Sequence, residues 1–146
     1  MPVTIRPLER SDHAGWRRLW TGYLTFYETV LPEEVYAATW ERLFADGAYE
    51  PRGWLAILDG RPVGLVHAIM HRTCWAVADN CYLQDLYADP EVRGQGIGRA
   101  LIEQVYRHAD ALGANTVYWV TQESNATARR LYDRIARDTR YVKYQR

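Results

Sequence analysis

The fold is decided by the stretch Asp89-Pro90-Glu91-Val92-Arg93-Gly94-Gln95-Gly96-Ile97-Gly98-Arg99, which has three glycines at alternate positions. Glycines at this spacing let the backbone come close to a ligand and point successive N–H groups the same way. A helix that starts here adds unpaired N–H groups and the positive end of its dipole, and both favour an anion. The stretch therefore predicts a phosphate site between a strand and a helix.

A second interpretation of this loop stays open at the level of its residues. The glycines do not follow the G-x-G-x-x-G pattern of dinucleotide-binding loops, and no lysine follows them as a Walker loop requires. A tight turn from a strand to a helix that binds no ligand has similar residues.

The segments around the loop predict the order strand, helix, strand, helix. A strand is expected over 82–88, and Gly113 is suited to cap the helix that follows the loop. A further strand is expected over 116–121, before a helix capped by Ser124 or Asn125. The apolar positions of the two helices are Ile97, Leu101, Val105 and Leu112 in the first, and Ala128, Leu131, Tyr132 and Ile135 in the second.

The residues upstream predict one strand, two helices and a β-hairpin. The strand is expected over 3–6, and the second helix is expected to begin at Pro32. Asp59-Gly60 is a strong hairpin signal between strands over 54–58 and 62–71. The first helix carries an aromatic stripe at helical spacing, made of Trp16, Trp20, Tyr23 and Tyr27.

A last short strand over 141–144 completes the order β-α-α-β-β-β-α-β-α-β. This order predicts a single α/β domain over residues 1–146, with a mixed central sheet flanked by helices. A chain of 146 residues is long enough to bury a sizeable core.

Composition argues against several classes of function. The chain has 18 basic and 18 acidic residues, whereas a protein that binds nucleic acid usually has a basic excess. No apolar run approaches the roughly 18 residues that cross a bilayer. Two cysteines are too few for a zinc site or a disulfide framework, so we expect no metal. These features predict a cytoplasmic protein that binds neither nucleic acid nor a membrane.

Two motifs together resemble the GNAT superfamily of N-acetyltransferases. Residues 93–98 match its R/Q-x-x-G-x-G/A signature, and the strand over 117–120 leads into Asn125-x-x-Ala128-x-x-Leu131-Tyr132 as in that family. Residues 82–87 resemble a strand of the diamine, polyamine and small histone acetyltransferases. The resemblance implies a GNAT-like sheet and acetyl-CoA as cofactor.

The resemblance also implies which residues hold the cofactor. The backbone of Leu86, Tyr87 and Ala88 would pair with the pantetheine arm like an added strand. Asn125 would contact the cofactor near the pantetheine, and Arg129 would reach a phosphate. The pyrophosphate would be held by Arg93, Gly94, Gln95, Gly96, Ile97, Gly98 and Arg99.

Catalytic roles follow in the same way for Tyr132 and Gln84. Tyr132 matches the family's proton donor to the departing thiolate, although a core tyrosine on the same helical face would look identical. Gln84 stands where diamine acetyltransferases have a glutamate, and an amide can orient an amine or a water but cannot take its proton. Asp85 is expected on the opposite face of an extended strand unless a bulge intervenes. The general base therefore stays open, and His67 or His71 acting through water is a weaker alternative to solvent.

The acceptor is expected to be a primary amine of a small molecule, polyamine-like or diamine-like. The predicted acceptor residues are Tyr23, Tyr27, Glu28 and Trp119. A protein lysine or N-terminus is the second candidate acceptor, and a non-catalytic acyl-CoA sensor is an alternative of another class. Relatives complete the region after the last helix across a dimer, so the resemblance also implies a homodimer.

Overall fold

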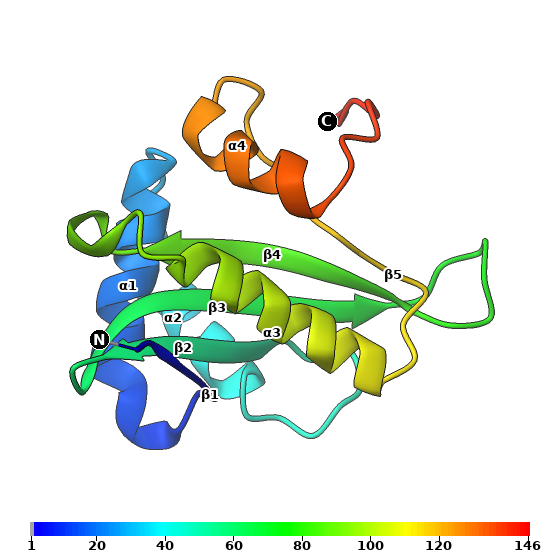
Figure 1. Ribbon diagram of the computed structural model, residues 1–146. Coiled ribbons are helices and arrows are strands. Elements are labelled where there is room, and N and C mark those ends of the chain that lie inside the picture. The colour runs from blue at the N-terminus through cyan, green and yellow to red at the C-terminus, as the bar shows by residue number, and fades with distance from the viewer. Residues whose placement is uncertain (1) are drawn as a thin grey trace.

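The computed structural model describes residues 2–146 and contains one five-stranded sheet in the order β1-β2-β3-β4-β5. The first four strands are antiparallel neighbours, and β5 runs parallel to β4, which makes the sheet mixed (Figure 1). The strands are β1 (Thr4–Pro7), β2 (Arg52–Leu58), β3 (Arg61–His71), β4 (Asn80–Ala88) and β5 (Thr116–Tyr118).

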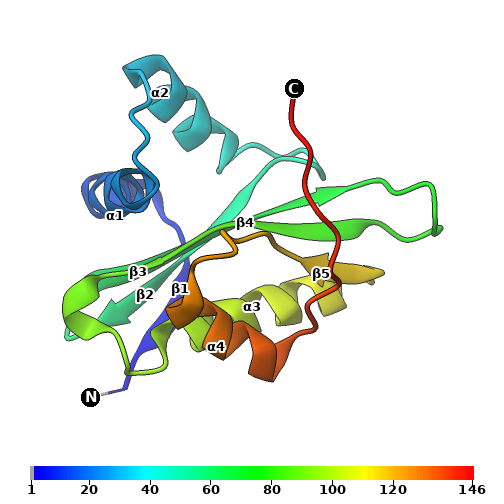
Figure 2. The ribbon, with the colours of Figure 1, turned by 90° about the horizontal axis from the view of Figure 1, so that it is seen from above.

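Helices cover both faces of the sheet because each carries one apolar side. The helices α1 (His13–Phe26) and α2 (Glu33–Arg42) pack on one face, and α3 (Ile97–Ala111) and α4 (Ala126–Ile135) lie on the other (Figure 2). The aromatic stripe of α1 buries Trp16 completely, as the helical spacing predicts. Two short 3-10 turns, η1 (Arg10–Asp12) and η2 (Pro90–Val92), lead into α1 and into residues 93–98, which we call the glycine loop.

A β-bulge interrupts β4 beside the middle of β3. His67 pairs with Asp85 and Ala68 pairs with Leu83, so Gln84 is the extra residue on the bulged strand. A bulge leaves its extra residue outside the ladder and re-aims the side chains that follow it.

The bulge changes which side chains of β4 face each helix layer. Without it, residues at even spacing would stay on one face of the strand. Asp85 instead contacts Trp20 of α1, and Tyr87 packs in the same α1-side cluster. The residues of β4 on the α3 side are Cys81, Leu83, Leu86 and Ala88.

The strands β4 and β5 separate soon after they pair. They share the three pairs Asn80–Thr116, Cys81–Val117 and Tyr82–Tyr118. Beyond these pairs the chain after β5 leaves the sheet towards α4 (Figure 1). Among residues 2–146, the edge of β4 over 83–88 therefore has no strand on its β5 side.

The predicted fold class is confirmed, with three local differences. Residues 141–144 form no strand and are exposed, because β-propensity alone does not supply a partner edge. The strand expected over 116–121 ends at Tyr118, where its pairing with β4 ends. Leu112, expected on the apolar face of α3, caps that helix and is 57% exposed. Within residues 2–146, no helix is both long enough and apolar enough to cross a membrane.

Candidate active site

The glycine loop connects β4 to α3 and has the backbone that an anion site needs. Gly94 and Gly96 have φ of 82° and 78°, in the left-handed region that strains residues with a Cβ. A Cβ built at either position would meet no atom within 4 Å, so the space beside the loop is open. The helix α3 begins at Ile97, and its first N–H groups lack partners within the helix. The loop therefore has both the donors and the space for a pyrophosphate.

The three arginines expected at the cofactor differ in their contacts. Arg99 pairs with Glu103 one turn later at 2.9 Å. Arg129 pairs with Asp138 at 3.2 Å. Arg93 is exposed at the start of the glycine loop. Arg93 is thus the best placed of the three to meet a phosphate, since the other two would have to leave an acidic partner.

The edge of β4 and the cap of α4 flank the gap between β4 and β5. Leu86, Tyr87 and Ala88 pair with β3 on one side, and their other side faces the gap. Asn125 caps α4, because its Oδ1 accepts a hydrogen bond from the Ala128 N–H at 3.4 Å. The backbone of β4 can therefore accept an extended chain as a further strand, and Asn125 fixes the start of the helix opposite.

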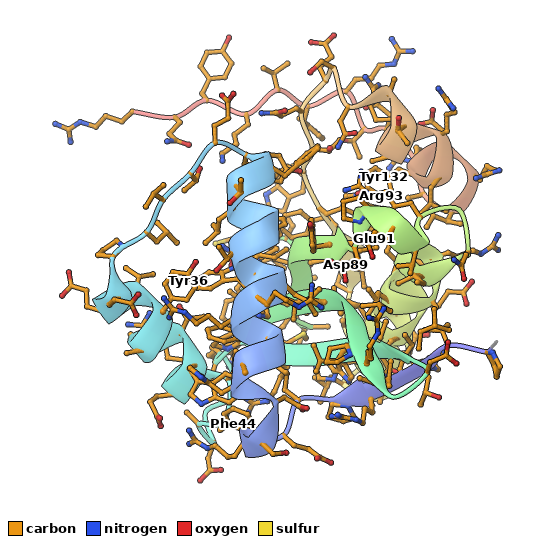
Figure 3. The ribbon with its side chains drawn as sticks, turned by 90° about the vertical axis from the view of Figure 1, so that its left-hand side faces the viewer. Tyr36, Phe44, Asp89, Glu91, Arg93 and Tyr132 are labelled. Atoms are coloured by element: carbon orange, nitrogen blue, oxygen red, sulfur yellow. The ribbon has the colours of Figure 1, made fainter. Side chains whose placement is uncertain are left out.

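Tyr132 lies on α4 and is partly buried. Its ring meets Trp119 edge-on, with 5.3 Å between the ring centres. Burial, followed by the influence of Tyr27, raises the pKa of Tyr132 to about 12. Figure 3 shows Tyr132 and Arg93 on the same side of α1, away from Tyr36. The Tyr132 hydroxyl therefore keeps its proton at neutral pH.

Trp119 thus belongs to the packing around Tyr132. It also lies 6.3 Å from the ring centre of Tyr106 and is part of the cluster on the α3 side of the sheet. Trp119 therefore packs against the predicted proton donor, Tyr132, on the face of the sheet opposite α1.

Asp85 faces α1 and joins a buried hydrogen-bond network. Its Oδ2 accepts hydrogen bonds from His67 Nδ1 at 2.8 Å and from Trp20 Nε1 at 3.3 Å. Trp16 Nε1 donates to His67 Nε2 at 3.0 Å. His67 and Asp85 are 3% and 8% exposed. The bulge at Gln84, which is itself exposed, brings the carboxylate into this network.

Neither of the two histidines has a nitrogen available for a substrate. Both ring nitrogens of His67 are bonded, to Trp16 and to Asp85. His71 bonds the carbonyl of the next residue at 2.7 Å and the Tyr118 hydroxyl at 2.7 Å. The structure therefore argues against either histidine as the general base.

The Tyr23 hydroxyl reaches the bulge next to Asp85, where it donates to the Gln84 carbonyl at 3.4 Å. The charge of Asp85 acts on Tyr23 and Tyr82, and we call these three residues the tyrosine–aspartate cluster. Burial, with the charge of Asp85 next, raises the pKa of Tyr23 above its ordinary value. The same two causes raise the pKa of Tyr82. Tyr27 packs on Tyr23 with 5.0 Å between ring centres, and Glu28 is exposed at the turn that follows. The cluster is therefore an acidic group next to two neutral phenols.

Tyr82 and Asp85 are absent from the site residues predicted from the sequence, yet the sequence contains a signal for Asp85. The apolar residues of β4 on one face change from odd to even numbers between Leu83 and Leu86. Such a change in parity indicates a bulge, and a bulge brings Asp85 to the face of α1.

Known proteins match the chain over most of its length. The model of the acetyltransferase (GNAT) family matches residues 16–136. A D-amino-acid N-acetyltransferase, HPA3 of Saccharomyces cerevisiae, is 39% identical over 99% of this chain and 90% of its own length. A peptidyl-lysine N-acetyltransferase, YjaB of Salmonella typhimurium, is 31% identical over 79% of this chain and 72% of its own length.

Solved structures have the same fold. An aminoglycoside acetyltransferase, AAC(6')-Iy in complex with a bisubstrate analogue of CoA, aligns with a TM-score of 0.85 over 100% of this chain and 98% of its own, at 20% identity. From the family match and the identity to a known N-acetyltransferase, we conclude that the chain belongs to the acetyltransferase (GNAT) family and is an acetyl-CoA-dependent N-acetyltransferase.

Proposed function

We propose that the protein transfers the acetyl group of acetyl-CoA to the primary amine of a small molecule with an ammonium group, either diamine-like or an amino acid. The observation that carries this proposal is the buried Asp85 carboxylate, which accepts hydrogen bonds from His67 and Trp20. Burial, and then the charge of Asp85, raises the pKa of Tyr23 and Tyr82. Within residues 2–146, Asp85 has no Arg or Lys within ion-pair distance. A carboxylate next to phenol rings suits an ammonium group, through its charge and through cation–π contact.

The cofactor occupies the loop and the gap beside β4 in this proposal. The N–H groups of Gly94, Gly96 and Gly98 hold the pyrophosphate, with Arg93 beside it. The backbone of Leu86 to Ala88 binds the pantetheine arm as an added strand. Acetyl-CoA supplies a thioester, which an amine can attack.

The remaining steps belong to side chains of this chain. Asp85 attracts the ammonium group, and the exposed Gln84 amide orients the nitrogen as it loses a proton to solvent. A second proton leaves the nitrogen during the transfer. As the new C–N bond forms and the thioester C–S bond breaks, Tyr132 donates its hydroxyl proton to the departing sulfur. The second proton from the nitrogen then reprotonates Tyr132 through solvent.

An amine screen tests the proposed acceptor. Diamines, D- and L-amino acids and a lysine peptide would be compared by thiol release from acetyl-CoA. Turnover of a diamine or an amino acid with kcat/KM well above that of the peptide supports the proposal. Preference for the peptide would favour the activity named for the 31%-identical relative. Acetyl-CoA binding without any turnover would favour a sensor.

We also propose that the protein is a homodimer. Tyr141 and Tyr144 are 84% and 92% exposed in the extended C-terminal segment, and β5 lies at the edge of the sheet. A second copy could bury both features. Light scattering is expected to give twice the 17.0 kDa of one chain, and deletion of residues 141–146 is expected to lower this mass. A mass of one chain at micromolar concentration would contradict the dimer.

Replacing Gly96 with Ala is expected to weaken acetyl-CoA binding at least about tenfold, because it strains the backbone and fills the open side of the loop. Titration calorimetry measures the Kd. The control is Gly113→Ala, which has a similar φ of 70° but lies at the far end of α3. Both variants should lose similar stability, and only Gly96→Ala should lose affinity. Equal affinities would remove the loop from the binding site.

Replacing Tyr132 with Phe is expected to lower kcat about 100-fold, since general acids contribute roughly that much. The Kd for acetyl-CoA should change little, because packing on Trp119 is kept. Steady-state kinetics on the best amine measures both effects, with Tyr36→Phe as a control for the loss of a hydroxyl away from the site. A kcat equal to that of the wild type would rule out the proposed proton donor.

A further inference from the structure

The bond from Trp16 to His67 determines the protonation of a buried histidine. An indole N–H can donate a hydrogen bond but cannot accept one. Since Trp16 Nε1 lies 3.0 Å from His67 Nε2, that ring nitrogen must carry a lone pair and no proton. His67 must then carry its single proton on Nδ1, which donates to Asp85 Oδ2 at 2.8 Å. The contact between His67 and Asp85 is therefore a hydrogen bond from a neutral imidazole, not an ion pair.

Asp85 consequently has no cationic partner among the groups around it. Its neighbours are Trp20 and Tyr23 from α1, His67 from β3 and Tyr82 from its own strand. None of these four groups is a cation when His67 is neutral. From β2, Gly53 lies beside the imidazole and carries no charge; a Cβ there would clash with Leu8 Cδ1 and would lie 3.3 Å from His67 Cδ2. Burial makes a carboxylate without a counterion costly, so an ammonium group that reached it would be bound favourably.

We propose that Trp16 is a positioning residue for acetyl transfer: it keeps His67 neutral, and so leaves the charge of Asp85 available to the ammonium group of the acceptor. This inference rests on the proposed function. Without the indole N–H, no donor occupies the lone pair of His67 Nε2, so this nitrogen can take a second proton as the pH falls. The imidazolium would then neutralise Asp85 and compete with the acceptor.

A purely structural role for Trp16 gives a different expectation. Trp16 is completely buried among Trp20, Tyr36 and Trp40, so its replacement removes packing whatever happens to His67. Loss of packing has no reason to depend on pH between 6 and 8.5. The pH dependence of acceptor binding therefore separates the two roles.

The first test uses the wild-type protein and requires no turnover. Nitrogen-15 NMR of the histidine side chains is expected to show His67 with a proton on Nδ1 and none on Nε2 from pH 6 to pH 8. A proton on Nε2, or conversion to imidazolium near pH 6.5, would overturn the proposal. This NMR result does not depend on the acceptor. Absence of amine acetylation would contradict the proposed function but would not change the measured tautomer of His67.

The second test compares Trp16→Phe with a control, Trp20→Phe. The control removes an indole that donates a hydrogen bond to Asp85 and none to His67. For Trp16→Phe, the KM for the amine is expected to be several-fold above the wild-type value at pH 6 and to approach it at pH 8.5. The kcat and the Kd for acetyl-CoA should change little. Any effect of Trp20→Phe on KM should be the same at both pH values. A pH-independent change in Trp16→Phe would overturn the proposal.

A double variant tests whether His67 is the titrating group. In Trp16→Phe with His67→Asn, the Asn amide can still donate to Asp85 near the position of Nδ1 but cannot become a cation. The pH dependence of KM should disappear. Its persistence would show that another group titrates and would also overturn the proposal. If the variants do not fold, the NMR result on the wild type decides.

Discussion

The bulge at Gln84 is the constraint on which the site depends. One extra residue in β4 turns Asp85 towards α1, while Leu86 and Ala88 turn to the opposite helix layer. A regular strand would bury the carboxylate among the apolar side chains of the α3 side, where it would have no donors and a large desolvation cost. Because of the bulge, the Asp85 carboxylate reaches hydrogen-bond donors while the apolar side chains after it pack in the hydrophobic cluster on the α3 side.

Two separate parts of the sheet serve the two substrates in this account. The cofactor side uses backbone: the left-handed glycines, the first turn of α3 and the edge of β4 beyond its short pairing with β5. The acceptor side uses side chains of α1, β3 and β4, held by hydrogen bonds that cross the core. Backbone recognition suits a cofactor of constant structure, whereas side chains can differ among relatives that acetylate different amines.

The parts of the fold that depend on local signals could be predicted from the sequence. Alternate glycines, the Asp59-Gly60 turn and the apolar spacing of α3 each act through neighbouring residues, and the structure confirms the elements that they predict. The prediction of a strand over 141–144 was wrong, because a strand needs a partner strand and strand propensity does not specify one. The network from Trp16 to Asp85 could not be predicted, because its bond from Trp16 to His67 joins residues 51 positions apart through a tertiary contact. The orientation of the Asp85 side chain could be predicted from the sequence only through the change from odd to even apolar positions along β4.

The central claim is that the Asp85 charge recruits a cationic acceptor. Its most direct test is kcat/KM for the best amine with wild type and with Asp85→Asn, which keeps the shape of the side chain and removes its charge. The account predicts a loss of at least about tenfold in kcat/KM, with the Kd for acetyl-CoA unchanged. An unchanged kcat/KM in a folded Asp85→Asn variant would contradict it.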